Sequence, residues 1–152
     1  MLDLGTLSGD TQSRASQVND QGMVVGSSEG SGGVRAFVWT REHGMQALGS
    51  LSGSTYSEAY AINGARQIVG ESGSPLGTRA FLWTSSGGMV DLNELVPGLP
   101  ADVVLTGAFA INDKGEIVAF GIRSSKTNRH QPATADSHIH SGPTRVFLLT
   151  PQ

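Results

Sequence analysis

Hydrophobic and polar residues alternate along this chain in short runs that Gly, Ser, Asn or Pro interrupt. Alternation with a period of two is typical of strands with one face toward a core, and the interrupting residues are typical of turns. No run shows helical spacing over a comparable length. In the central part of the chain the pattern predicts four strands, over Met45–Leu51, Ser57–Asn63, Gln67–Ser72 and Arg79–Thr84.

One strand pattern is apolar on both sides. In the run from Ala36 to Trp39, Phe37 and Trp39 share one face while Ala36 and Val38 share the other. Residues 80–83 repeat this pattern, so we expect the strand to be covered on both faces and both Trp residues to serve the core. The segments 19–22 and 112–115 begin with Asn-Asp and end with Gly, which predicts hairpin turns.

The chain contains an internal repeat. Residues 1–44 and 45–88 align without a gap and are identical at 20 of 44 positions. A third copy, 89–152, carries insertions of 5 and 17 residues relative to the others. Four strands repeated at this interval are typical of β-propeller blades.

We therefore predict one all-β domain over residues 1–152, built from propeller-like four-stranded blades. Three blades are too few for a closed ring, because propellers have about four to eight. Either a homodimer completes the ring or the chain is part of a longer protein. The alternative fold is a β-trefoil, in which three four-stranded units close without a partner.

Composition narrows the functional classes. The 10 basic and 13 acidic residues give a net charge of −3, which argues against nucleic-acid binding through a basic surface. No apolar run approaches the length of a membrane-spanning helix, and the first residues lack the pattern of a signal peptide. The absence of Cys excludes disulfides and thiolate chemistry.

The chain resembles the HAF-repeat family of extracellular bacterial repeat proteins. The resemblance lies in the phrases Asp3–Gly9, Val24–Gly26, Ala61–Asn63 and Arg79–Thr84. The family tripeptide His-Ala-Phe is replaced by Arg-Ala-Phe in the first two copies and by Arg-Val-Phe in the third. The resemblance implies a secreted origin and implies no catalytic residues.

The long insertion holds the densest group of residues suited to catalysis. On an extended segment Asp136, His138 and His140 share one face, and two imidazoles with a carboxylate are a suitable ligand set for Zn²⁺. A water on that metal would be a nucleophile near neutral pH. The alternative is a solvated loop, because the surrounding segment is rich in Ser, Thr, Asn and Pro.

Two further groups are candidates for ligand binding. Arg35, Arg79 and Arg145 occupy one repeat position, where they would either hold the structure together through carboxylates such as Asp3 and Asp91 or bind an anion. Tyr56 and Tyr60 occur only in the second copy and would either line a carbohydrate groove or lie on the surface.

Two hypotheses for function follow from these residues. The first is a secreted module for binding or interaction, with a carbohydrate or another small molecule among its possible ligands. The second is a small hydrolase for esters, phosphoesters or glycosides, with Asp136, His138 and His140 as metal ligands or acid–base groups.

Overall fold

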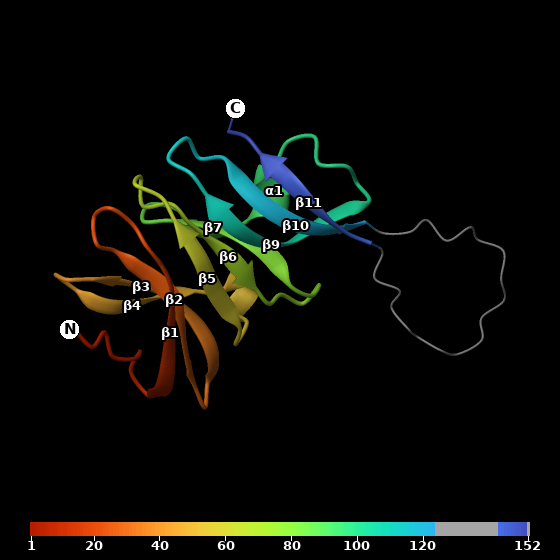
Figure 1. The fold of residues 1–152 in the computed structure, drawn as a ribbon. Coiled ribbons are helices and arrows are strands. Elements are labelled where there is room, and N and C mark those ends of the chain that lie inside the picture. Colours follow the sequence, from red (N-terminus) through yellow and green to blue (C-terminus); the bar gives the residue numbers. More distant parts are fainter. Residues whose placement is uncertain (124–142, 152) are drawn as a thin grey trace.

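The structure is a computed structural model that describes residues 1–123 and 143–151. The described strands form three antiparallel sheets that follow one another along the chain (Figure 1). The first sheet contains β1 (Asp10–Val18), β2 (Val24–Gly30), β3 (Gly33–Thr40) and β4 (Gly44–Gly49). The all-β class predicted from the alternating pattern is confirmed.

The second sheet is built in the same way from β5 (Ser57–Ile62), β6 (Ile68–Ser72), β7 (Arg79–Thr84) and β8 (Gly88–Asp91). The third contains β9 (Val103–Ile111), β10 (Ile117–Arg123) and β11 (Thr144–Leu149) among the described residues. In each sheet, strands consecutive in sequence are paired neighbours, and the first strand lies at an edge. We call these edge strands, β1, β5 and β9, the first strands.

The sheets do not coincide with the sequence copies. The strand that opens the second copy, β4, pairs with β3 of the first sheet, and β8 likewise pairs with β7. Each full sheet therefore takes three strands from one copy and its fourth from the next. The grouping of four strands within one copy was wrong, because the alternating pattern fixes a strand but does not specify its neighbour.

Two short helical turns interrupt the strands. Residues Leu51–Gly53 form a 3-10 turn, η1, and Leu92–Leu95 form a single α-helical turn, α1. Asp91 caps α1 by accepting a hydrogen bond from the backbone N–H of Asn93 at 2.9 Å. This turn lies where the third copy carries its five-residue insertion, and the all-strand prediction missed it because four residues are too few to show helical spacing.

Two hydrophobic clusters hold successive sheets together. Between the first and second sheets, Ala36 and Val38 of β3 pack with Ala59 and Ile62 of β5. Between the second and third sheets, the buried residues include Val69, Ala80, Leu105 and Ala119. The first strands β5 and β9 thus each cover a face of the preceding sheet.

The predicted turns and the doubly covered strand are present. Asn19 Oδ1 accepts hydrogen bonds from the N–H groups of Gln21 and Met23, which closes the turn between β1 and β2. Phe37 is 1% exposed and Ala36 is fully buried, although they lie on opposite faces of β3. Trp39 and Trp83 are only half-buried, so the rings reach the rim of the core.

Candidate functional site

Two tyrosines of the second copy lie beside carboxylates. Tyr56 directly precedes β5 and Tyr60 lies within it, with Glu58 between them. The Tyr60 hydroxyl donates a hydrogen bond to Glu58 Oε2 at 2.8 Å, and the Tyr56 hydroxyl donates to Glu71 Oε1. Glu58 and Glu71 are opposite one another on β5 and β6. We call Tyr56, Glu58, Tyr60, Glu71 and Phe109 the tyrosine–carboxylate cluster.

The hydrogen bonds from the two phenols reduce the repulsion between these carboxylates. Like charges directly opposite on neighbouring strands destabilise a sheet, and each phenol donor offsets part of that repulsion. Burial is the main cause that raises the pKa of both Tyr56 and Tyr60, and the hydrogen-bonded carboxylates raise it further. Both hydroxyls therefore stay protonated at neutral pH and hold the carboxylates in place as acceptors.

An aromatic surface adjoins these carboxylates. The ring of Tyr60 stacks on Phe109 of β9 with centroids 4.6 Å apart and planes inclined by 17°. Phe109 also contacts Phe120, yet its side chain is 38% exposed. A Cβ atom at Gly107 would lie 2.7 Å from the Phe109 ring and 2.9 Å from Glu71 Oε2, so glycine is required for this approach.

Glu58 joins the cluster to a small polar pocket. The pocket has a volume of about 70 Å³ and lies between the first sheet and β5. Arg14 and Glu29 bring further charge to its lining, and Gln12, Ser13, Ser27 and Val34 complete it. A space of this size admits about two water molecules or one hydroxyl-bearing group. The region therefore combines an exposed aromatic ring with several hydrogen-bond acceptors.

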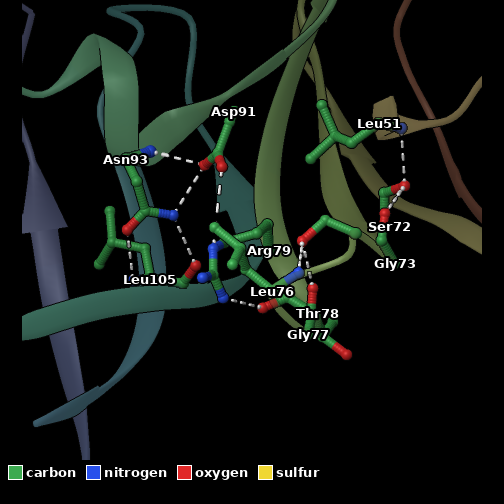
Figure 2. A network of polar contacts seen from close by, with 11 residues as sticks. Leu51, Ser72, Gly73, Leu76, Gly77, Thr78, Arg79, Asp91, Asn93 and Leu105 are labelled. Carbon is green, nitrogen blue, oxygen red and sulfur yellow. Dashed lines mark hydrogen bonds and ion pairs between the residues drawn. The ribbon is translucent and has the colours of Figure 1, made fainter. Parts of the chain in front are cut away.

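Arg79 lines a separate and wider groove of about 660 Å³. Its Nε is 3.9 Å from Asp91 Oδ2, and its Nη1 donates to the carbonyl of Thr78 at 3.2 Å. Asp91 also accepts from Asn93, as Figure 2 shows. Because Asp91 and Glu94 both line the groove, the charge of Arg79 is balanced locally and the groove is a poor anion site.

The other two arginines of this repeat position have different surroundings. Arg35 forms an ion pair with Asp10 at 2.8 Å and donates to the carbonyl of Ser8 at 3.0 Å. Arg145 lies on β11 and is exposed. Arg35 and Arg79 therefore have structural contacts, with Asp10 taking the place expected for Asp3. All three lie on the third strand of a sheet.

The predicted catalytic and metal-binding residues Asp136, His138 and His140 lie outside the described residues. Within residues 1–123 and 143–151 no group of three or more His, Asp or Glu side chains is placed to hold a metal ion. The hydrolase hypothesis therefore stays a prediction that rests on sequence alone.

Sequence reasoning found the two tyrosines but missed their partners. When the second and third copies are aligned at Asn63 and Asn112, Phe109 falls at the position of Tyr60 and Phe120 at that of Glu71. This alignment was the signal in the sequence that could have identified both aromatic residues. Glu58 lies between two tyrosines at strand spacing, which also placed it on their side. The cross-strand position of Glu71 depended on the register of β5 and β6, which the pattern did not supply.

Comparisons of this chain with protein-family models, with curated proteins and with solved structures found no match. Among the described residues, no helix has the length and apolar character needed to cross a membrane.

Proposed function

We propose that this chain is a secreted module that binds carbohydrate at the tyrosine–carboxylate cluster, and that its sheets are blades of a β-propeller. The blade arrangement is supported by two antiparallel four-stranded sheets, by a 44-residue repeat and by the stacking of β5 and β9 on the sheets that precede them. Three separate sheets favour blades over a trefoil, whose strands share one barrel. The proposal of secretion rests on the HAF-repeat resemblance.

The observation that carries the proposed function is the exposed Phe109 ring beside carboxylates that accept hydrogen bonds. A pyranose ring presents a face of C–H groups and a rim of hydroxyl donors. The C–H face would pack on Phe109 by dispersion, and the hydroxyls would donate to Glu58 and Glu71 in charge-assisted hydrogen bonds. Both carboxylates keep free lone pairs after accepting one hydrogen bond each from a phenol.

Calorimetric titration with a panel of neutral mono- and oligosaccharides tests the proposal. We expect saturable binding by at least one member and a loss of about tenfold in affinity for Phe109→Ala, since removal of one stacked ring is worth about 1.4 kcal/mol. Glu58→Gln should weaken the same ligand by several-fold, because a neutral amide replaces a charged acceptor.

Glu42→Gln is the matched control, because the Glu42 side chain is 84% exposed in a turn between β3 and β4. It should bind like the unmodified chain. The proposal fails if no saccharide binds, or if Phe109→Ala binds as tightly as the control.

A further inference from the structure

The outer face of the third sheet exposes apolar side chains at positions that are buried in the first sheet. Val146 and Leu148 of β11 are 63% and 64% exposed. Their repeat equivalents in the first sheet are Ala36, which is fully buried, and Val38, which is 5% exposed. The exposed face of β11 is therefore the counterpart of a buried contact seen inside the chain.

The structure shows what covers this face in the first sheet. Ala36 and Val38 pack against β5, the first strand of the following sheet, where Ile62 is 2% exposed. Val18 of β1 holds the repeat position of Ile62 and is 59% exposed. The chain thus carries both halves of the same contact uncovered, one on β1 and one on β11.

The third sheet also has an edge strand, β11, whose outer edge is unpaired among the described residues. Among the described residues, β11 has no fourth strand beside it, whereas β3 pairs with β4 and β7 pairs with β8. Residues 1–5 align with β4 and β8 in the sequence repeat but belong to none of the three sheets. Met1 and Leu2 are fully and 56% exposed, respectively. Figure 1 places these residues beside the first sheet, at the opposite end of the molecule from β11.

Residues 1–5 already adopt local contacts of a fourth strand. The Asp3 carboxylate accepts from the N–H of Gly5 at 3.0 Å, as Asp91 accepts from the N–H of Asn93 at 2.9 Å after β8. The Ser13 hydroxyl donates to the carbonyl of Gly5 at 2.7 Å. These contacts reduce the conformational entropy that pairing would otherwise cost.

Ser57 makes two hydrogen bonds at the contact between the first and second sheets, and Ser13, at the same repeat position, makes only one of them within the described part of the chain. In the full contact, the Ser57 hydroxyl donates to the carbonyl of Gly49 at 2.8 Å and also accepts from the N–H of Ala36 at 3.0 Å. Ser13 makes the equivalent donation, and the equivalent donor to its oxygen is the N–H of Val146.

Charge also matches across the two surfaces. In the second sheet, Arg79 on the third strand pairs with Asp91 on the fourth. The equivalent residues for the third sheet are Arg145 on β11, which is exposed, and Asp3 in residues 1–5, which is exposed as well. Pairing residues 1–5 with β11 would bring these two opposite charges together.

We propose that a second copy of this chain packs head to tail on the third sheet. Its β1 covers Val146 and Leu148, and its residues 1–5 add to β11 as the fourth strand. The registers of Val38 opposite Gln46 and of Leu82 opposite Val90 place Leu148 opposite Leu2 of the second copy. The inference rests on the blade arrangement proposed above and is independent of the ligand.

The expected assembly is a closed dimer. A head-to-tail contact closes into a ring when the rotation allows it, and otherwise extends into a filament. Two copies supply six sheets, twice the three formed by the described residues of one chain, which lies within the range of about four to eight blades in known propellers. Three copies would exceed that range.

Sedimentation velocity of the purified chain tests the assembly. We expect a species of twice the chain mass of 15.8 kDa. Leu148→Lys should shift this species to the monomer, because it places a charge in the apolar contact. Leu76→Lys is the matched control, since Leu76 is 80% exposed in the loop between β6 and β7 and lies outside the proposed contact. A monomer at all concentrations of the unmodified chain would overturn the proposal.

Cysteine cross-linking tests the register, and the chain offers a clean background because it has no Cys. Paired antiparallel residues have Cα atoms about 4.5–5.5 Å apart, which a disulfide spans. A mixture of Leu2→Cys and Leu148→Cys chains should yield the mixed disulfide dimer on mild oxidation. A mixture of Leu2→Cys and Leu76→Cys chains should yield only a small fraction of that amount of mixed disulfide dimer. Equal yields would contradict the register.

The two proposals fail separately in these experiments. A dimer with the expected cross-link that binds no saccharide overturns the carbohydrate site and leaves the head-to-tail contact. A monomer that binds saccharide, with affinity lost in Phe109→Ala, overturns the head-to-tail contact and leaves the ligand site.

Discussion

The side-chain amide of Asn63 donates a hydrogen bond to the main-chain carbonyl of Asn112, 3.0 Å away in the equivalent turn of the next sheet. Asn19 donates to the carbonyl of Asn63 in the same way at 3.1 Å. Both bonds join residues at one repeat position, so each turn is tied to its neighbour. Asn63 is 3% exposed, and its Oδ1 also accepts from the N–H of Gln67. One side chain thus closes its own hairpin and connects two sheets.

The first prediction concerns this connection. Asn63→Ala removes the half-buried bond to the Asn112 carbonyl as well as the side-chain bonds to Gln67 in its own turn, so we expect a loss of about 1–3 kcal/mol in the free energy of unfolding. Urea denaturation measures the difference. Asn112→Ala is the matched control, because the Asn112 amide donates within its own turn to Glu116. If Asn112→Ala costs as much as Asn63→Ala, the connection between sheets contributes nothing.

The second prediction concerns a buried serine that is repeated in the first two sheets. The Ser72 hydroxyl accepts from the N–H of Leu51 at 2.9 Å and donates to the carbonyl of Tyr56 at 3.0 Å (Figure 2 shows the contact with Leu51). Ser28 makes the equivalent bonds to Leu7 and Gln12. The third sheet has Gly121 at this position.

Ser72→Ala should lower the free energy of unfolding by about 1–3 kcal/mol, because the hydroxyl is fully buried and both of its backbone partners lose a hydrogen bond. Chemical denaturation measures this change. Ser74→Ala is the control, since the hydroxyl of Ser74 bonds to Gly77 within an exposed loop. Equal stability of Ser72→Ala and the unmodified chain would show that the hydroxyl contacts are energetically neutral.

The sequence predicted local structure well because the information was local. The strand predicted over Arg79–Thr84 matches β7, and the strand predicted over Ser57–Asn63 ends one residue beyond β5. Alternation and turn residues specify where a strand begins and ends. The repeat likewise predicted that Arg79 and Asp91 could pair, because Arg recurs at one repeat position in all three copies and Asp at another in the first and third.

Pairing between strands was not predicted in the same way. The strand β4 joins β3 of the preceding copy, because it pairs with the sheet edge that is free once the hairpins have formed. Alternation of polar and apolar residues does not specify which edge a strand pairs with. The carboxylate Glu71 entered the candidate site through cross-strand register with Glu58. Asp10 replaced Asp3 as the partner of Arg35 because Asp10 begins β1, close to the start of β3.

The third prediction concerns the glycine beneath Phe81. Gly70 is opposite Phe81 in the register of β6 and β7, and the Phe81 side chain is fully buried. A Cβ atom at position 70 would lie 1.9 Å from the carbonyl oxygen of Glu58 and 2.9 Å from the Phe81 ring. Neither backbone nor a packed ring can move away without disrupting the sheet.

We expect Gly70→Ala to lower the melting temperature by about 2–12 °C or to prevent soluble expression, because such overpacking costs about 1–3 kcal/mol and each kcal/mol lowers the melting temperature by about 2–4 °C at this chain length. Gly32→Ala is the matched control, because a Cβ atom there has no neighbour within 4 Å. Thermal denaturation followed by circular dichroism compares the two. A Gly70→Ala protein as stable as the control would mean that β5 and β6 can separate without cost.

The fourth prediction concerns the pH dependence of stability at the Asp10–Arg35 pair. The Asp10 carboxylate is 2.8 Å from Arg35 Nη2, and its side chain is 4% exposed. The hydrogen bond from Arg35 is the main cause that lowers the pKa of Asp10 below its ordinary value, with Ser28 adding to the effect. The unfolded chain therefore binds a proton at this carboxyl more readily than the folded chain does.

It follows that Asp10 contributes stability fully above the ordinary carboxyl pKa of about 3.9, and that this contribution is lost as the pH falls below it toward the lowered value. Asp10→Asn cannot take up this proton. The difference in free energy of unfolding between the unmodified chain and Asp10→Asn should thus be largest near pH 7 and should shrink as the pH falls below about 4. Urea denaturation at pH 7, 4 and 3 measures this difference in free energy.

Asp20→Asn removes the same charge from an exposed turn and is the control. A difference that stays constant across this pH range would show that Arg35 does not favour the charged form of Asp10.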